Sequence, residues 1–403
     1  MRLINLDNNS TTPLLPEVAD AMTQCDAMGY GNPASAHQLG RQTRTVLESA
    51  REEIVRLLGG RTAGRSPDRL IFTSGGTEAN NLAIFGLRNK ERRSNSSAVD
   101  GPPESIVISA IEHPSVVGPA ERLAQRGTNL ERLRISSFGV VDVFHLNDLV
   151  AADNAEQIPP IRLVSIMLGN NETGVLQPII ELTKVCRENG ILVHVDAVQA
   201  AGKMPLDFQA MNISAISLSA HKIHGPRGIG ALLLRHDAHL EPLFFGGFQQ
   251  TGLRPGTESI SLATGLLTAL RAWDCERNER TAHLRKLRDH FESRLRAELP
   301  TIVVNGADAE RLPHTSNMAF PGLDRQELFL ALDMEGVLCS TGSACASGSS
   351  DPSPTLIAMG LGDARVRSSL RFSFGIQNSL AEVDEAIERI VATCRRLWVR
   401  PKR

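Results

Sequence analysis

The sequence lacks a strong charge of either sign, and it lacks long apolar runs. Lysine and arginine number 43 against 45 aspartate and glutamate residues, so the formal net charge is −2. No extended Lys/Arg run occurs, and no stretch approaches about 18 consecutive apolar residues. We therefore expect neither nucleic-acid binding, nor attachment to an anionic membrane surface, nor a membrane span, and we expect small molecules or proteins as partners.

Paired cysteine motifs are also missing. The six cysteines show no C-x-x-C pair and no zinc-like spacing; they stand at Cys25, Cys186, Cys275, Cys339, Cys345 and Cys394. Residues 1–12 are polar and contain no apolar signal core. We expect a cytoplasmic protein in a reducing compartment, with no disulfide framework and no metal site.

One segment has almost no side chains that could be buried. Residues 340–354 (STGSACASGSSDPSP) contain no aromatic residue and no aliphatic residue larger than alanine. Such a segment is expected to be exposed and mobile, because little apolar burial offsets the entropy of ordering it. Cys345 in its middle is either a thiol kept for its reactivity or an incidental surface cysteine, and the segment alone favours neither.

Alternating strand and helix patterns define the fold class. Short β-branched runs separated by helical patterns predict an α/β domain with a mostly parallel sheet; the runs are 69–73, 105–109, 162–167, 191–196, 213–219 and 231–235. Residues 89–104 and 151–160 are polar and turn-rich, so we interpret them as surface loops.

The pattern changes after about residue 258. A long charged helical region (261–295) is followed by short strands and a last helix at 380–397, which is typical of a smaller α+β domain. A chain of 403 residues exceeds the usual span of one hydrophobic core. We assign residues 13–260 to a large domain, and residues 1–12 and 261–403 to a small domain that carries Cys345.

The segment 69–84 (RLIFTSGGTEANNLAI) runs from a strand through a glycine-rich turn into a helix that we expect to begin near Glu78. Glycine allows close backbone approach, and the free N–H groups of a helix start suit a phosphate. Gly76 and Thr77 are therefore candidate phosphate ligands. An ordinary N-capped turn is the alternative.

Two further strands end in candidate polar residues. Asp196 ends the run LVHVD, and Gln199 follows three residues later. Ligands of open α/β sheets bind at the carboxyl ends of strands, where an acid can hold a protonated pyridine nitrogen. A helix N-cap is an equally good interpretation of Asp196.

Lys222 lies where the chain leaves the apolar strand that precedes SAHKIHGPRGIG. Desolvation there would lower the pKa of its amine and favour attack on a carbonyl. Ser219 and His221 flank it and could donate to a phosphate. A solvated surface lysine is the alternative.

Three more residues have suitable positions. His113 (in SAIEHPSVV) and Asn171 (in LGNNETG) each follow an apolar strand, so both would reach the same edge of the sheet. A neutral imidazole can stack on a planar cofactor and exchange protons, although a structural histidine is the default interpretation. Arg371 lies between apolar strand residues and needs an anionic partner, for which a substrate carboxylate would serve.

These segments together resemble the cysteine desulfurases of the NifS/IscS-like branch, which are pyridoxal-phosphate enzymes of the class V aminotransferase family. The similarity covers nearly the whole chain, and the motifs keep the family's order and approximate spacing: LDNNSTTP, YGNPASAH, FTSGGTEANNLAI, EHPSV, NNETG, HVDAVQ, SAHKIHGPRGIG, RPGTES, STGSACASGS and SLRFSFG. The resemblance implies the fold type I of pyridoxal-phosphate-dependent transferases and a homodimer.

The resemblance also implies roles for single residues. Lys222 would be the Schiff-base lysine, Asp196 the partner of the pyridine nitrogen, and His113 the ring that stacks on the cofactor and handles protons. Gln199 would bind the phenolic oxygen. The phosphate would be held by Gly76, Thr77, Ser219 and His221, with Thr257 from a second subunit.

On the substrate side, the resemblance implies that Asn171 and Arg371 hold the carboxylate of L-cysteine. Cys345 would take the sulfur as a persulfide, L-alanine would leave, and an acceptor or iron–sulfur scaffold protein would receive the sulfur.

Some positions depart from the family pattern. Phe248 stands where a glycine is common and Gln250 where an acid is common, so contacts at the subunit boundary are open. The sequence ends soon after the last expected helix, without the tail by which housekeeping members contact their scaffold protein, so the sulfur acceptor is also open. The alternatives are a selenocysteine lyase or another class V enzyme, and a non-catalytic interaction protein of sulfur assembly.

Overall fold

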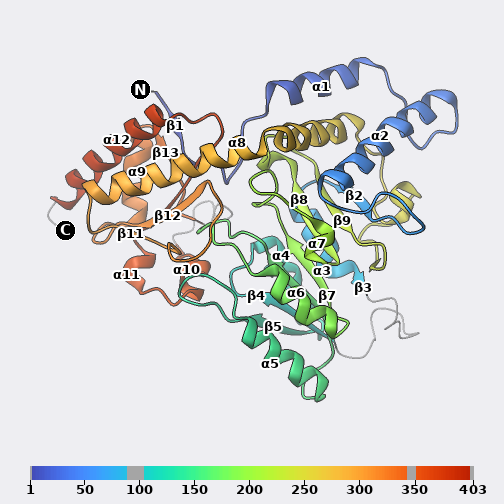
Figure 1. Cartoon of the computed structure of the whole chain (residues 1–403), viewed down its shortest axis with the longest axis horizontal. Helices are drawn as coiled ribbons and strands as arrows, with labels where there is room; N and C mark the ends of the chain where they lie inside the picture. Colours follow the sequence, from blue (N-terminus) through green and yellow to red (C-terminus); the bar gives the residue numbers. More distant parts are fainter. Residues whose placement is uncertain (1, 89–103, 343–350, 400–403) are drawn as a thin grey trace.

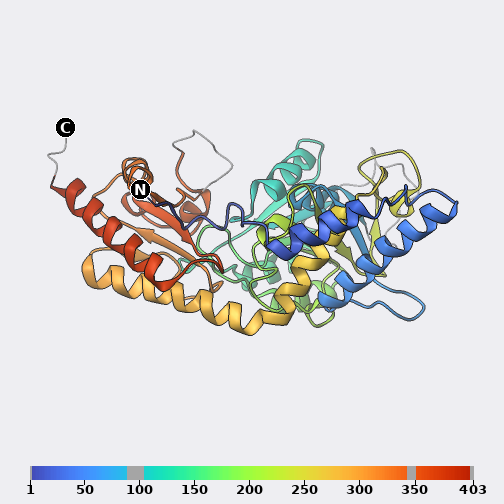
Figure 2. The same cartoon turned by 90° about the horizontal axis from the view of Figure 1, so that it is seen from above.

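The chain forms an elongated molecule built around two sheets and one helix that runs along both. The computed structural model describes residues 2–88, 104–342 and 351–399. The seven-stranded sheet and its helices occupy one end, and the three-stranded sheet with both chain ends occupies the other (Figures 1 and 2). Helix α8 (Ile260–Glu298) extends from one end to the other (Figure 2).

The large sheet is mostly parallel, which confirms the predicted fold class. Its order is β2-β9-β8-β7-β6-β4-β5, and β9 alone runs against its neighbours within it. The strands are β2 (Arg69–Thr73), β4 (Ser105–Ser109), β5 (Asn129–Leu133), β6 (Ile161–Met167), β7 (Leu192–Asp196), β8 (Ala215–Ser219) and β9 (Gly230–Leu234).

One edge strand was not predicted from the sequence. Strand β5 (NLERL) pairs with β4 at the edge of the sheet, and only Leu133 among its residues is buried. An edge strand with a charged surface shows neither the apolar run of a central parallel strand nor regular alternation.

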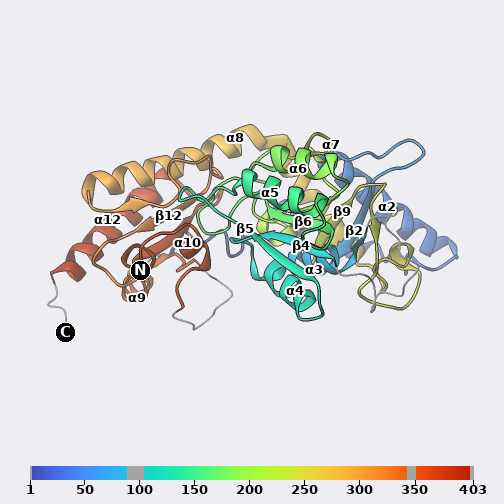
Figure 3. The ribbon, with the colours of Figure 1, turned by 90° about the horizontal axis from the view of Figure 1, so that it is seen from below.

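Alternate side chains of each strand enter different hydrophobic clusters. Val107 packs with the helices of one face, whereas Ile106 and Ile108 pack with those of the other. Helices α3 (Gly76–Gly86) and α4 (Pro114–Ala124) cover the latter face. The opposite face is covered by α2 (Gln38–Leu57), α5 (Val143–Asn154), α6 (Ile179–Glu188), α7 (Phe208–Met211) and the start of α8 (Figure 3).

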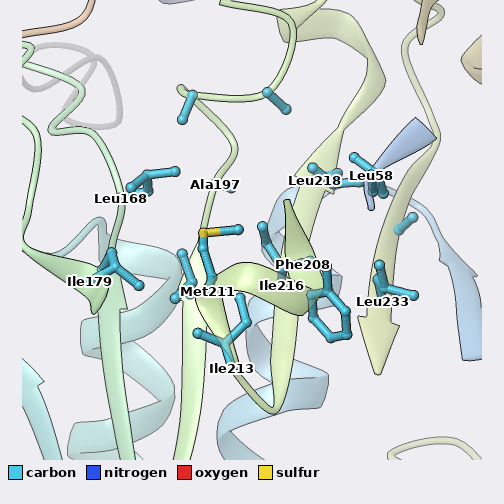
Figure 4. Close-up of a cluster of buried hydrophobic side chains, with 14 of the residues drawn as sticks. Leu58, Leu168, Ile179, Ala197, Phe208, Met211, Ile213, Ile216, Leu218 and Leu233 are labelled. Atoms are coloured by element: carbon cyan, nitrogen blue, oxygen red, sulfur yellow. The ribbon is translucent and has the colours of Figure 1, made fainter. Parts of the chain in front are cut away.

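The core on that face holds the sheet and its helices together. Figure 4 shows Ile216 and Leu218 of β8 beside Phe208 of α7 and Leu233 of β9. Helix α1 (Pro16–Ala27) packs along α8 at the same end of the molecule.

The other end has its own hydrophobic cluster. Phe291 of α8 lies 4.9 Å from Phe372, centroid to centroid, and both are buried. The elements there are β1 (Ile4–Asn5), β11 (Val303–Val304), β12 (Thr315–Ala319), β13 (Val337–Leu338), β14 (Ser369–Ser373), α9 (Arg325–Met334), α10 (Pro354–Ala358), α11 (Asp363–Val366) and α12 (Leu380–Trp398).

The N-terminal strand β1 belongs to this end of the molecule because it pairs with a strand more than 300 residues away in sequence. Strand β1 pairs in parallel with β13, and the three-stranded sheet has the order β11-β12-β14. The predicted last helix is confirmed as α12. The remaining short elements are β3 (Leu87–Arg88), β10 (His239–Leu240), and the 3-10 turns 220–222 and 249–252.

The predicted surface loop at 151–160 is wrong in its first residues. Helix α5 continues to Asn154, because Leu146 and Val150 are buried and the alanines that follow favour another helical turn. The polar residues at the start of the segment 151–160 lie on the solvent-facing side of the end of α5. The predicted loop at 89–104 lies outside the described residues except for Glu104. No helix in the described ranges combines the length and the apolar character needed to cross a bilayer.

Candidate active site

A cavity of about 880 Å³ opens at the carboxyl ends of the parallel strands. Residues after β2, β4, β6, β7 and β8 line it, as expected for a ligand site of an open α/β sheet. The structure brings together at this cavity most of the residues singled out in the sequence, namely Gly76, Thr77, His113, Asn171, Asp196, Gln199, Ser219, His221, Lys222 and Arg371. Thr257 is exposed and does not line it, and Cys345 lies outside the described residues.

The start of α3 forms one corner of the cavity. Helix α3 begins at Gly76, two residues earlier than expected, so the N–H groups of its first turn have no partner within the helix. A Cβ built on Gly76 would lie 2.8 Å from Val198 and 3.4 Å from Ser219. Glycine therefore keeps this corner open for an anion that binds the helix start.

The amine of Lys222 is held by the N-terminal segment. Its Nζ donates to the carbonyl of Ser10 over 2.9 Å and also to the carbonyl of Asn9, which accepts from Gln199 as well, over 3.1 Å. The buried Lys203 donates through Nζ to the carbonyl of Lys222 over 2.6 Å. Burial, reinforced by the nearby charge of Lys222, lowers the pKa of Lys203 to about 7.

A chain of polar side chains joins Asp196 to His113. Asp196 is buried at the end of β7, and its Oδ1 accepts from the backbone N–H of Val198 over 2.9 Å. Asn80 of α3 donates to Oδ2 of Asp196 and to Oγ of Ser115, which in turn lies 2.7 Å from Nδ1 of His113. Asp196 thus caps a turn and not a helix, which was one interpretation of the sequence, and it also faces the cavity.

The hydrogen bonds of His113 define its tautomer. Nδ1 accepts from the backbone N–H of Ser115 over 3.1 Å, so the neutral ring carries its proton on Nε2. Burial lowers the pKa of His113 from its ordinary value, and Lys222 lowers it further, against the opposing effect of Asp196. The ring is therefore neutral at pH 7, with a donor at Nε2.

Other titratable groups at the cavity are also held neutral. Burial, together with Lys222 and Arg227, lowers the pKa of His221 to about 4, and its Nδ1 lies 3.1 Å from Oγ1 of Thr11. Burial raises the pKa of Glu112 to about 8, and repulsion from Asp196 adds to this effect. Oε1 of Glu112 accepts from the backbone N–H of Met167 over 2.9 Å.

Arg371 of β14 is fully buried where the two ends of the molecule meet. Its Nη2 donates to Oδ1 of Asp7 over 2.8 Å and to Oγ of Ser10 over 3.0 Å, and its Nη1 donates to the carbonyl of Asn171 over 3.0 Å. The anionic partner that the sequence required is therefore Asp7. Nε of Arg371 is buried without a hydrogen-bond partner among the described residues, which leaves a donor for a further acceptor.

Several cavity residues were missed by sequence analysis; these are Asn9, Ser10, Asn80, Glu112 and Ser115. Asn80 could have been found, because it follows Gly76 by four residues and so shares its helix face. Asn9 and Ser10 could not have been found. They contact Lys222 through their backbone carbonyls, and only the fold brings these carbonyls to a residue more than 200 positions away.

The described cysteines separate into buried and exposed thiols. Cys25, Cys186, Cys339 and Cys394 are buried, and Cys275 of α8 is exposed. Burial raises the pKa of Cys186 and of Cys394 to about 12, and it raises that of Cys339 further. Cys339 is thus a packing residue of the hydrophobic cluster around Phe291.

The structure explains the departure from the family pattern at position 250. Oε1 of Gln250 accepts from the backbone N–H of Phe72 over 2.7 Å, and its Nε2 donates to the carbonyl of Phe72 over 2.9 Å. The amide therefore pairs with the free edge of β2 as a neighbouring strand would, which a carboxylate cannot do because it has no donor. Phe248 is 90% exposed.

Comparison with known proteins gives the family. The aminotransferase class-V model matches residues 4–386. The cysteine desulfurase IscS of Dictyoglomus turgidum is 35% identical over 98% of this chain and 96% of its own. A cysteine desulfurase of Enterobacter agglomerans is 38% identical over 98% of this chain and 94% of its own.

The chain belongs to the class-V aminotransferase family, in its cysteine desulfurase branch. The crystal structure of a NifS-like protein from Rickettsia africae agrees with this placement, with 30% identity, a TM-score of 0.83, and coverage of 97% of this chain and 99% of that one. The resemblance inferred from the motifs is thereby confirmed, together with the fold.

The cavity also suits the cofactor of this family. Buried polar atoms with no hydrogen-bond partner among the described residues include Asn9 Oδ1, Asn80 Oδ1, Glu112 Oε2 and Arg371 Nε, and all four residues line the cavity. Unpaired buried polar atoms indicate a polar ligand. With the glycine corner, the amine of Lys222 and the carboxylate of Asp196, they fit a phosphorylated pyridine aldehyde.

Proposed function

We propose that the protein is a cysteine desulfurase that uses pyridoxal 5'-phosphate to take sulfur from L-cysteine. The observation that carries this proposal is the shared cavity, in which the amine of Lys222, the carboxylate of Asp196 and the glycine corner at Gly76 face one space. The cofactor, when bound, supplies an electron sink for the electron pair released at the substrate Cα.

The residues of the chain then divide the binding task. Lys222 would hold the aldehyde carbon, and Asp196, fixed by Asn80, would hold the pyridine nitrogen in its protonated form. Gln199 would donate to the phenolic oxygen and His113 would stack on the ring. The phosphate would be bound by Gly76, Thr77, Ser219 and His221.

The substrate carboxylate has donors beside it. Arg371 offers the unpartnered Nε, and Asn171 lines the same wall of the cavity. Lys222 would take the Cα proton, and the neutral His113, with its proton on Nε2, would orient the substrate and donate a hydrogen bond.

Cys345 would accept the sulfur. Its thiolate attacks the substrate sulfur, an S–S bond forms while the C–S bond breaks, and the carbon keeps the electron pair, gains a proton and leaves within L-alanine. The enzyme keeps the persulfide, so no external oxidant or reductant is consumed. An acceptor or scaffold protein would then receive the sulfur.

The test compares single substitutions in purified protein loaded with the cofactor, with dithiothreitol present to reduce the persulfide and release its outer sulfur as sulfide. Lys222→Ala should abolish both sulfide and alanine production, and borohydride should fix the cofactor to Lys222 in the wild type only. Cys345→Ala should abolish sulfide release from L-cysteine and keep the absorption of the bound cofactor. The matched control is Cys275→Ala, which removes an exposed thiol on α8. Undiminished sulfide release by Cys345→Ala would refute the role of that thiol.

The same variant separates the enzymatic alternatives. Selenide can leave without a nucleophilic thiol, so a selenocysteine lyase would keep its activity toward selenocysteine when Cys345 is replaced. Turnover of both amino acids by the wild type and by Cys345→Ala measures the difference.

We further propose a homodimer in which Thr257 completes the phosphate site of the partner. Thr257 is exposed and does not line the cavity of its own subunit. On the same loop, the side chains of Phe244, Phe245 and Phe248 are 52%, 87% and 90% exposed. An exposed aromatic cluster of this kind is typical of a protein interface. Sedimentation should give a dimer, and Phe245→Ser with Phe248→Ser should weaken it; a monomeric wild type would contradict the proposal.

The domain limits remain a proposal as well. We place the large domain at 13–260 and the small domain at 1–12 and 261–403. The separate hydrophobic clusters at the two ends of the molecule support two domains, although residues 263–270 of α8 pack in the cluster of the large sheet. Cytoplasmic location stays a prediction from the sequence.

A further inference from the structure

Glu172 is a buried carboxylate of the NNETG motif to which the proposed reaction gives no part. It lines the cavity, is 5% exposed and belongs to the turn that follows β6. Its backbone is fixed, since its N–H donates to Oδ1 of Asn170 over 2.9 Å and its carbonyl accepts from Asn317 of β12 over 3.3 Å. The carboxylate therefore projects from a rigid position.

Two chain segments far from Glu172 in sequence meet at this carboxylate. Oγ of Ser353 donates to Oε2 of Glu172 over 2.6 Å, and Thr355 also donates to the carboxylate. A Cβ on Gly342 would lie 2.5 Å from Oε2, and Gly342 has a φ of +108°. Glycine is thus required at 342 both by the backbone conformation and by the closeness of Glu172.

These segments are the stems of the stretch that contains Cys345. The first stem is 340–342, where Ser340 pairs with Arg371 through both backbone groups, at 3.0 and 2.7 Å. The second stem is 351–355, where Arg325 donates to the carbonyl of Asp351. The first stem therefore lies beside Arg371, the arginine proposed to bind the substrate, and the second stem is held by Arg325.

Two arginines, Arg371 and Arg325, lie close enough to the carboxylate of Glu172 to stabilise its charge. Burial raises the pKa of Glu172, while Ser353, Arg371, Thr355 and Arg325 each oppose that rise. A buried carboxylate that accepts from hydroxyls and faces two cations is costly to leave without them.

We infer that Glu172 is a positioning residue that clamps both stems of the Cys345 segment to the cavity wall beside Arg371. This inference rests on the proposed function. Fixing both ends of a short segment limits the space that its middle can explore, and this raises the effective concentration of the thiol near the substrate. Glu172 itself touches neither substrate nor cofactor in this account.

Loss of Glu172 should affect two parts of the reaction differently. Exchange of the Cα proton needs Lys222 and the cofactor, whereas sulfur transfer also needs Cys345. Glu172→Ala should lower sulfide release from L-cysteine by about ten- to hundredfold, the factor expected when hydrogen bonds to a charged group are lost. Exchange of the Cα proton of L-alanine for deuterium, followed by NMR, should change less than about threefold, within the range of a minor rearrangement.

Partner substitutions make the test specific. Gly342→Ala should reproduce the loss, because its methyl group would displace the carboxylate. Glu172→Ala and Ser353→Ala should be non-additive in the double variant, as for residues in direct contact. Glu172→Gln keeps the shape of the side chain but removes its charge, so it tests the same loss if Glu172→Ala fails to fold. Glu181→Gln, at an exposed position of α6, is the matched control.

A second readout does not depend on catalysis. The rate at which iodoacetamide alkylates Cys345, measured by peptide mass spectrometry relative to Cys275, should rise about fivefold in Glu172→Ala and Gly342→Ala, because loss of a hydrogen bond frees the stems. Unchanged alkylation in both variants would overturn the inference, as would an equal loss of deuterium exchange and sulfide release. A wild type that releases no sulfide would instead refute the proposed function, and the alkylation result would still decide the role of Glu172.

Discussion

The side-chain amide of Asn80 donates to Oδ2 of Asp196 over 2.7 Å. The two residues are 116 positions apart, and α3 places Asn80 one helical turn beyond the glycine corner. The same amide donates to Ser115 over 2.8 Å, and Ser115 bonds to His113. One side chain therefore fixes the acid proposed for the pyridine nitrogen and, through Ser115, the ring proposed to stack on the cofactor.

Asn80→Ala should weaken binding of the cofactor by about 10- to 100-fold. The hydrogen bond to the buried carboxylate is expected to be worth about 1.5–3 kcal/mol, and its loss leaves Asp196 less well oriented. Titration of the apoprotein with pyridoxal 5'-phosphate, followed by absorbance, measures the change. Asn147→Ala, which removes an exposed amide of α5, is the control. An unchanged dissociation constant for Asn80→Ala would show that Asp196 needs no such support.

Ser115→Ala should shift the acidic limb of the pH profile of kcat/KM to higher pH. The hydroxyl of Ser115 donates to Nδ1 of His113 and so stabilises the neutral ring; its removal should raise the lowered pKa of His113 toward the ordinary value. We expect a shift of roughly half to one pH unit, the equivalent of one hydrogen bond. Ser137→Ala, at an exposed position, should leave the limb in place. A limb that stays fixed or moves to lower pH in Ser115→Ala would contradict this role.

His194 should make the folded protein less stable in acid. It is fully buried between Ser165 and Ser217, and burial lowers its pKa to about 3. Between about pH 6.5 and pH 3 the unfolded chain binds a proton that the folded chain does not, so the free energy of unfolding falls as the pH falls. The loss amounts to about 2 kcal/mol at pH 5.

His194→Gln should reduce that dependence. Urea unfolding at pH 7 and pH 5 should show a smaller difference for the variant than for the wild type, whatever the variant's stability at pH 7. The half-buried His221 and the buried His224, whose pKa values burial lowers to about 4, should keep part of the effect. Equal pH dependence in the two proteins would count against a neutral buried His194.

Gln250→Glu should destabilise the free edge of β2, although an acid is common at this position in the family. The carboxylate would lose the donor to the carbonyl of Phe72 and place an oxygen against it, at an expected cost of about 1–3 kcal/mol. Arg51 already donates to Oε1 of Gln250 over 3.0 Å and already pairs with Glu258, so a salt bridge to the new acid should return only about 1 kcal/mol. Calorimetry should therefore give a lower Tm, with Gln42→Glu, an exposed position of α2, as control. A Tm equal to or above that of the wild type would mean that Arg51 dominates.

The sequence predicted those parts of the site that follow directly from strands. Each central strand is an apolar run with a polar residue at its end, and parallel strands end at one edge, so Asp196, Lys222, His113 and Asn171 could be expected to meet. Helix α12 and the strand that holds Arg371 were likewise evident from local periodicity.

Other features have no local signal. The edge strand β5 has no apolar run because only Leu133 among its residues is buried, and the end of α5 resembles a loop because its polar residues are exposed. The carbonyls of Asn9 and Ser10 reach Lys222 only because β1 pairs with β13 and carries the N-terminal segment across the molecule.

The sequence by itself determined the family, the mostly parallel α/β fold and the residue types that meet at the strand ends, because these depend on periodicity and on motif spacing along the chain. The tertiary structure decided which groups hold those residues in place. Asn80 reaches Asp196, Asp7 reaches Arg371, and Glu172 reaches Ser353 across sequence separations of 116, 364 and 181 residues. Such contacts depend on the packing of elements that are distant in sequence, and no local pattern of residues encodes them.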